Sequence, residues 1–172
     1  ANFNELVTLK ANGATAYVNA DNGKVLCFGS EYSFYACRNL TVKAVKSTDV
    51  KASVDVISTP VLDGSGKVYL VGSFALPQGA TIKNFGFVMD GNAATATATN
   101  LTLADVDQAK QIFNLTASKY TNYGQNGNQF TISFNAKAGY PTANYVAYAI
   151  YTDANGNECY AYSNVIANAA IA

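Results

Sequence analysis

The stretch from Tyr145 to Ile166 constrains the fold most, because apolar and polar residues alternate on both sides of a turn signal. That signal is Asn155-Gly156, and an Asn-Gly pair between alternating segments favours a two-residue hairpin turn with positive φ at both positions. With this pair at the tip, Tyr151 is expected opposite Tyr160. The sequence therefore predicts that the chain ends in an antiparallel β-hairpin.

This register gives the hairpin two different faces. The mainly aliphatic face is expected to join the core and carries Val146, Tyr148, Ile150, Cys159, Ala161 and Val165. The other face is a band of aromatic and small residues and carries Tyr145, Ala147, Ala149, Tyr151, Tyr160 and Tyr162. The four tyrosines of this band have three open interpretations. They form a ligand-binding site that stacks on sugar rings or anchors a protein, an interface covered by the N-terminal part of the chain, or a plain sheet surface.

Alternating apolar segments bounded by turn clusters run through most of the chain and predict an antiparallel β-protein. In the first part these segments are 6–11, 15–20, 24–28, 32–37 and 40–45. In the second part they are 53–58, 68–76, 82–89, 129–136, 145–152 and 158–166. Asp21-Asn22-Gly23 predicts a further hairpin turn, with Val18 opposite Cys27 and Ala20 opposite Val25.

A polar connection over 46–51 separates the two groups of strands, so we place a boundary near Asp49. A small β module is expected over 1–48 and a sandwich over 49–172. Between Thr102 and Phe113 the apolar spacing is helical, and Thr102 with Asp105 resembles a helix start. We expect one short helix there, with a bulged edge strand as the alternative. The expected core residues are Phe34, Val42, Val71, Phe85, Phe87, Ile132, Phe134, Tyr148 and Ile150.

Charged residues are scarce and balanced, at 13% of the chain with a formal net charge of 0. No basic patch is present, so we expect no nucleic-acid partner. No apolar run is long enough to span a bilayer, so no membrane span is expected. The chain has neither an initiator Met nor a signal peptide, and we expect it to be a segment of a longer polypeptide with flanking domains.

Candidate chemical sites are few because the chain contains no histidine. Histidine is the commonest general base and metal ligand, so we assign no catalytic residue, metal or cofactor and expect no enzyme activity. Cys27, Cys37 and Cys159 lack zinc-ligand spacing and are interpreted as buried thiols. The segment 153–158 has oxygen ligands at alternate positions, as a calcium loop does, but it lacks the distal Glu, and a hairpin turn explains the same residues.

Two segments resemble known families. The first match lies in Gly23-Lys24-Val25, Tyr32-Ser33-Phe34-Tyr35 and Val42-Lys43-Ala44-Val45. The stretch 21–45 is similar to the end of an internalin-type repeat found in secreted proteins of Gram-positive gut bacteria. The second part resembles a fibronectin type III or immunoglobulin-like module, whose strand-F tyrosine stabilises a corner. That match lies in 145–151, 153–156, Tyr162-Ser163 and Phe85-Gly86-Phe87-Val88.

These resemblances imply an all-β protein in which a small N-terminal β module precedes an antiparallel immunoglobulin or fibronectin-like sandwich with one short helix. They imply a non-catalytic structural or adhesive module of a secreted or cell-surface bacterial protein, located outside the cell. The implied partners are an unidentified protein or glycan at the cell surface. The alternative function is a carbohydrate-binding module that uses Tyr145, Tyr151, Tyr160 and Tyr162.

Overall fold

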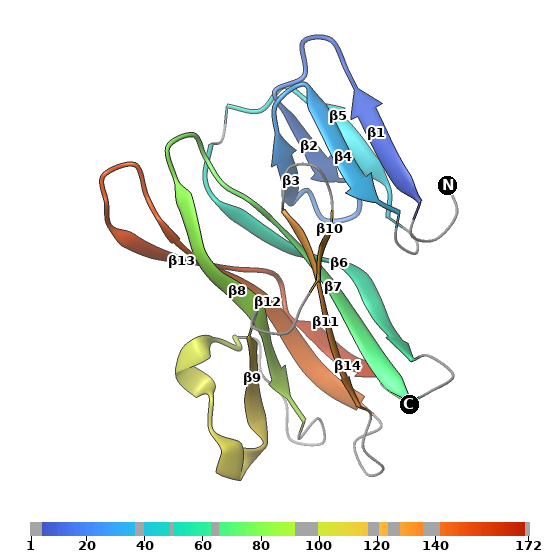
Figure 1. Ribbon diagram of the computed structural model, residues 1–172, viewed down its shortest axis with the longest axis vertical. Coiled ribbons are helices and arrows are strands. Elements are labelled where there is room, and N and C mark those ends of the chain that lie inside the picture. Colours follow the sequence, from blue (N-terminus) through green and yellow to red (C-terminus); the bar gives the residue numbers. More distant parts are fainter. Residues whose placement is uncertain are drawn as a thin grey trace.

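The computed structural model of this chain consists almost entirely of β-strands (Figure 1). It describes residues 5–36, 40–48, 50–62, 66–91, 100–116, 121–123, 128–135 and 142–170. The N-terminal part contains β1 (Leu6–Lys10), β2 (Ala16–Asn19), β3 (Val25–Phe28), β4 (Glu31–Tyr35) and β5 (Val42–Val45). The remainder contains β6 (Ser53–Leu62), β7 (Lys67–Ala75), β8 (Thr81–Asp90), β9 (Ile112–Thr116), β10 (Thr121–Tyr123), β11 (Gln129–Asn135), β12 (Thr142–Thr152), β13 (Glu158–Tyr162) and β14 (Ile166–Ala170).

Two antiparallel sheets packed face to face form the larger part of the molecule. Their strand orders are β10-β11-β7-β6 and β13-β12-β8-β9, and β14 also pairs with β12. When the strands are lettered along the chain, the first sheet has the order D-E-B-A and the second the order G-F-C-C′, as in immunoglobulin-type sandwiches. The predicted all-β sandwich class is therefore confirmed. The segment 93–99, whose sequence suits a solvent-facing edge strand or a loop, lies outside the described residues.

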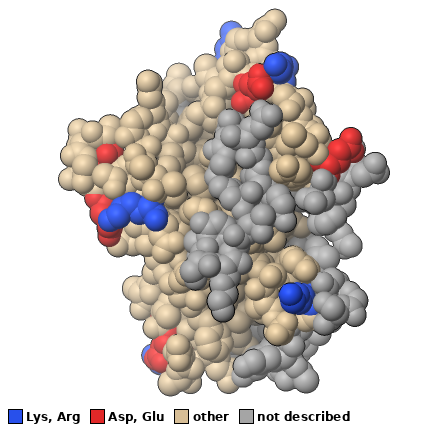
Figure 2. Space-filling view, in the orientation of Figure 1, with Lys and Arg blue, Asp and Glu red and all other residues tan. Residues whose placement is uncertain are grey.

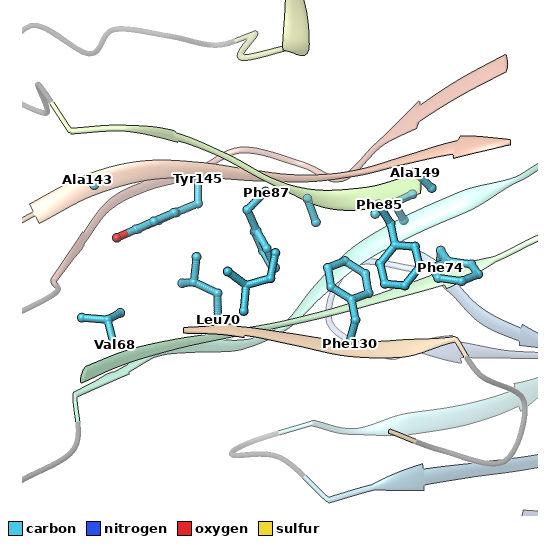
Figure 3. Packing of buried hydrophobic residues seen from close by; sticks show 12 residues of the cluster. Val68, Leu70, Phe74, Phe85, Phe87, Phe130, Ala143, Tyr145 and Ala149 are labelled. Atoms are coloured by element: carbon cyan, nitrogen blue, oxygen red, sulfur yellow. The ribbon is translucent and has the colours of Figure 1, made fainter. Parts of the chain in front are cut away.

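Phenylalanine rings fill the space between the two sheets (Figure 3). Phe130 on β11 lies 4.8 Å from Phe85 and 5.4 Å from Phe87, both on β8, measured between ring centroids. The same Phe130 ring lies across Gly72, its cross-strand partner on β7, where an added Cβ atom would overlap the ring. Gly72 is thus required by the close approach of an aromatic side chain, and the aromatic ring restores the packing that glycine lacks.

The predicted core is largely confirmed, but it is divided among three clusters. The buried members of the predicted set are Phe34, Val71, Phe85, Phe87, Ile132 and Tyr148. Val42, Phe134 and Ile150 are only partly buried. Strand β12 contributes to two of these clusters because its two faces are both covered.

The outer face of β8 and β12 is covered by the segment that the sequence predicted as one short helix. This segment forms two 3-10 turns, Leu103–Asp105 and Gln108–Lys110, followed directly by β9. The predicted start signal is present, since the Asp105 carboxylate accepts hydrogen bonds from Thr102 N at 2.8 Å and Thr102 Oγ1 at 2.9 Å. The helix does not continue because Asp107 caps the second turn through Ala109 N and Gln111 ends it at a positive φ of 64°.

The N-terminal part is built from two small sheets, β1-β4 and β3-β2-β5. They enclose a cluster in which the Tyr32 ring stacks on Phe34 with centroids 4.7 Å apart. The predicted hairpin between β2 and β3 is present, but its register is wrong. Asn19 N donates to Lys24 O at 2.9 Å and Val18 pairs with Val25, so the loop is longer than a two-residue turn.

This N-terminal part packs on the outer face of the β6-β7-β11 sheet, as the blue and green strands of Figure 1 show. Ile57 and Val71 from that sheet enter the N-terminal apolar cluster. Gln129 on β11 adds a pair of hydrogen bonds to the backbone of Tyr35. Tyr35 N donates to its Oε1 at 2.8 Å, and its Nε2 donates to Tyr35 O at 2.9 Å. The two parts therefore share both apolar and polar contacts.

A buried carboxylate completes this contact. The Asp55 side chain on β6 accepts hydrogen bonds from Asn19 Nδ2 at 2.8 Å and from Asn22 Nδ2 at 2.9 Å. The two amides are oriented by the turn itself, because Asn19 Oδ1 accepts from Asp21 N and Asn22 Oδ1 accepts from Lys24 N. An ionised carboxylate has only acceptors, so it suits two amide donors held in this way.

Candidate ligand-binding surface

The structure divides the four predicted tyrosines between the two faces of the hairpin. The predicted register is wrong by one residue, because Tyr151 pairs with Cys159 and Ile150 pairs with Tyr160. Side chains alternate along a strand, so this shift moves every residue of one strand to the other face. Tyr145 and Tyr151 therefore lie on the inner face, and Tyr160 and Tyr162 lie on the outer face.

The cause of the shift is the turn chemistry around Asp153. The carboxylate of Asp153 accepts hydrogen bonds from Asn155 N at 2.9 Å and Asn157 N at 2.8 Å. Gly156 has a φ of 87°, and its N–H donates to Asp153 O at 3.0 Å. These bonds form a three-residue loop, a type I turn followed by a left-handed glycine, in place of a two-residue turn.

Tyr145 belongs to the core and not to a surface. Its side chain is 1% exposed and lies among the apolar residues between the sheets (Figure 3). Burial raises the pKa of its hydroxyl, which has no hydrogen-bond partner among the described residues. The corner hydrogen bond implied by the fibronectin-like resemblance is therefore not made by this tyrosine within that part of the chain. Tyr151 is half-buried on the same face, and burial together with the facing Cys159 raises its pKa.

Tyr160 and Tyr162 lie two residues apart on the outer face of β13. Tyr160 is 53% exposed, and its hydroxyl donates a hydrogen bond of 2.7 Å to Glu158 Oε1, which raises the pKa of that hydroxyl. Glu158 in turn pairs with Lys83 on β8, so the Tyr160 ring is tethered to the sheet. Tyr162 is half-buried, and its hydroxyl accepts a long hydrogen bond of 3.4 Å from Leu103 N.

A groove of about 560 Å³ opens beside Tyr162. One wall is the segment 100–102, which leads into the first 3-10 turn, and the other is 162–165 with Ala167. Of these residues only Tyr162 was predicted as part of a site, since the two walls are about sixty positions apart and no spacing rule joins them. The helix-start signal at Thr102 and Asp105 is the one trace of this wall in the sequence.

The groove exists because one edge of β12 is shared by two strands. β13 pairs with the second half of β12 and β14 with the first half. Between them Ser163 keeps contact with β12, since Ala147 N donates to Ser163 Oγ and Ser163 N donates to Ala147 O, each at 2.9 Å. The chain then leaves the ladder at Asn164 and Val165, which line the groove.

The described residues of the N-terminal part do not cover Tyr160 and Tyr162, because they pack on the opposite sheet. This removes the interpretation of these two residues as an interface with that module. Their role as a ligand-binding site stays a prediction. In the described ranges, no group of three or more His, Cys, Asp or Glu side chains is placed to hold a metal ion.

The other groups considered from the sequence have local roles where the structure describes them. Asp153 uses its carboxylate in the hairpin turn, and Cys27 is buried with its thiol donating to Phe28 O at 3.3 Å. Cys159 is half-buried, and Cys37 lies outside the described residues.

Neither 3-10 turn in the described part is long and apolar enough to cross a membrane. No protein-family model matches this sequence, and no curated protein matches it significantly.

Proposed function

We propose that this chain is a non-catalytic structural or adhesive segment of a secreted or cell-surface bacterial protein, with its two β parts held in one orientation. The observation that carries this proposal is the buried contact in which Asp55 accepts hydrogen bonds from Asn19 and Asn22. Asp55 is 3% exposed, so a rotation of one part against the other would leave a buried charge and two amides unpaired. Such a loss is far more costly than losing an exposed contact.

The character of the surface supports an extracellular setting. Charged residues make up 13% of the chain, about half the usual share of a soluble domain. In Figure 2 the blue and red atoms form small, separate groups, and most of the described surface of this face is uncharged. The resemblance of 21–45 to a repeat of secreted bacterial proteins points the same way.

The experiment that tests a fixed orientation is a measurement of residual dipolar couplings in weakly aligned protein. Backbone amides of 5–45 and of 53–170 are fitted separately to an alignment tensor. A rigid segment gives one tensor for both sets, with the same magnitude and axes. Two different tensors would show that the parts move independently and would overturn the proposal.

A pair of alanine variants sharpens this test. Asp55→Ala removes the buried acceptor. The couplings of 5–45 and 53–170 should then fit two different tensors, or the tensor of 5–45 should have a smaller magnitude. Asp21→Ala removes an exposed carboxylate from the turn that carries Asn19 and Asn22, the two partners of Asp55, and is the matched control. It should leave the common tensor of the native protein unchanged.

Glycan binding is the second candidate function. It is favoured by the position of Tyr162 in the wall of a groove of about 560 Å³, with the exposed Tyr160 on the same face of the same strand. Tyrosine combines a flat apolar ring with a polar tip, which suits contact with sugar rings. Binding of oligosaccharides to the purified chain, followed by amide chemical shifts, tests this function.

A further inference from the structure

We propose that the groove between 100–102 and 162–167 binds an uncharged glycan, an inference that rests on glycan binding as the second candidate function. The site comprises Tyr160 and Tyr162 as ring contacts, with Asn100 and Asn164 as hydrogen-bonding groups on the two walls. Its volume of about 560 Å³ lies within the range of small-molecule sites. None of the described residues that line the groove has a charged side chain.

The walls offer unused hydrogen-bonding capacity. Asn100 and Asn164 are exposed, and neither side-chain amide has a hydrogen-bond partner within the described residues. Each amide provides two donor hydrogens and one acceptor oxygen. Sugar hydroxyl groups both donate and accept, so an amide on each side of the groove suits them better than it suits a purely acceptor ligand such as a carboxylate.

The groove is also lined by apolar residues of a buried cluster. Leu101 is buried in the cluster with Val146 and Tyr148, and Val165 packs against the same cluster. The lining therefore combines apolar residues with a few polar groups, as small-molecule sites commonly do. Lys83 on β8 and Glu158 on β13 form an ion pair, so their charges neutralise each other. A charged sugar would therefore find no opposite charge among the described residues of the groove to replace its lost hydration.

Tyr160 extends the site beyond the groove. It lies two residues from Tyr162 on the same face of β13, a separation of about 7 Å along a strand. The Tyr160 hydroxyl donates a hydrogen bond of 2.7 Å to Glu158 Oε1, so part of the rotational freedom of the ring is already lost before a ligand binds. Two tyrosine rings at this spacing can contact neighbouring sugar units of one chain.

The test is a titration of the ¹⁵N-labelled chain with defined hexasaccharides. The uncharged probes are cellohexaose, laminarihexaose, maltohexaose, mannohexaose and xylohexaose, and the charged probe is hexagalacturonate. An uncharged hexapeptide of alternating Thr and Val tests a protein-type occupant. At least one uncharged sugar should bind with a Kd of about 1 mM or tighter, with amide shifts confined to 100–102 and 158–167.

Single variants locate the binding. Tyr160→Ala and Asn164→Ala change side chains that are exposed, so both proteins should fold, and each should weaken binding roughly tenfold. Asn155→Ala is the matched control, because it removes an exposed amide from the tip of the same hairpin, outside the groove. It should bind the sugar as the native chain does.

The contrary results separate the two levels of the proposal. Binding of hexagalacturonate alone would overturn the uncharged ligand while leaving glycan binding intact. Failure of every sugar to bind would overturn both. Sugar binding that survives Tyr160→Ala and Asn164→Ala would place the site elsewhere. Binding of the peptide, with all sugars inactive, would assign the groove to a protein partner.

Discussion

Tyr148 on β12 lies directly opposite Gly86 on β8, and its hydroxyl lies 3.0 Å from the place that a Cβ atom on Gly86 would take. The same Cβ would overlap the backbone carbonyl of Leu115 on β9. A backbone group in a sheet cannot move aside as a flexible side chain can. Gly86→Ala should therefore lower the free energy of unfolding by about 1–3 kcal/mol, measured by denaturant titration.

Ser73→Ala is the control for this substitution. Ser73 lies in β7, is buried, and its hydroxyl has no hydrogen-bond partner among the described residues, so alanine there adds no atom and removes a buried polar group. Its stability should equal or exceed that of the native chain. Equal effects of the two substitutions would mean that alanine is tolerated opposite Tyr148 after all.

Two buried tyrosines on opposite faces of β12 should respond differently to loss of their hydroxyl groups. The Tyr148 hydroxyl donates to Asn114 Oδ1 at 2.9 Å, whereas the Tyr145 hydroxyl has no partner in the described part of the chain. Tyr148→Phe should cost about 0.5–1.5 kcal/mol, and Tyr145→Phe should be neutral or stabilising. The complete truncation Tyr148→Ala should cost about 3–5 kcal/mol. A destabilised Tyr145→Phe protein would reveal a hydrogen bond to that hydroxyl.

The alternation of apolar residues was sufficient to predict most of the strands and the sandwich. It did not predict β9 and β10, the break between β13 and β14, or the faces of the last hairpin. Ala147 and Ala149 are small, so we expected the bulkier neighbours of the other face to form the core. In the structure these alanines face the core between the two sheets, in one cluster with Phe85 and Tyr145. Bulk along one strand does not reveal which face the partner sheet covers.

The predicted register of the last hairpin, β12 with β13, was wrong for a related reason. The Asn155-Gly156 pair fits both a two-residue and a three-residue loop, and the side chain of Asp153 selects the longer one by accepting two backbone hydrogen bonds. The groove could not be predicted at all, because it depends on Leu101 packing in one cluster with Val165, where the chain has departed from β12 after Ser163. Such a contact between distant segments leaves no periodic trace.

Asp55 and Asp153 should titrate on opposite sides of the ordinary aspartate pKa of 3.8. Burial raises the pKa of Asp55, although the bonds from Asn19 and Asn22 oppose that shift. Hydrogen bonds from the backbone and side chain of Asn157 lower the pKa of Asp153, which lies at the surface. The ¹³C resonances of the two carboxyl groups, followed across the acid range up to neutral pH, measure both values in one sample.

The two groups should also affect stability in opposite directions. The stabilising contribution of the Asp55 pKa shift to the free energy of unfolding is fully present below the pKa of Asp55 in the unfolded chain. It is lost as the pH rises through the raised pKa of the folded protein. The contribution of Asp153 is present above its unfolded pKa and is lost as the pH falls through its lowered folded pKa. Asp153→Asn should therefore reduce the loss of stability in acid. A native Asp55 that titrates below 3.8 would contradict the assigned direction.

Gln129 provides two separable hydrogen bonds between the sandwich and the N-terminal part. Its Oε1 accepts from Tyr35 N and its Nε2 donates to Tyr35 O, while the side chain is only 4% exposed. Gln129→Ala should cost about 1–3 kcal/mol, because it leaves two backbone groups without these partners. It should also speed hydrogen exchange at the Tyr35 amide. Thr131→Ala, two positions along the same face of β11, should leave that amide protected.

Gln129→Glu separates the two bonds. A carboxylate still accepts from Tyr35 N but cannot donate to Tyr35 O, so the amide should remain protected from exchange while the protein loses stability. Raising the pH through the titration of the introduced carboxyl group should increase that loss, since burial penalises the charged form of the group and not the neutral one. Equal exchange rates at Tyr35 in the alanine and glutamate variants would mean that the side-chain oxygen does not hold this strand.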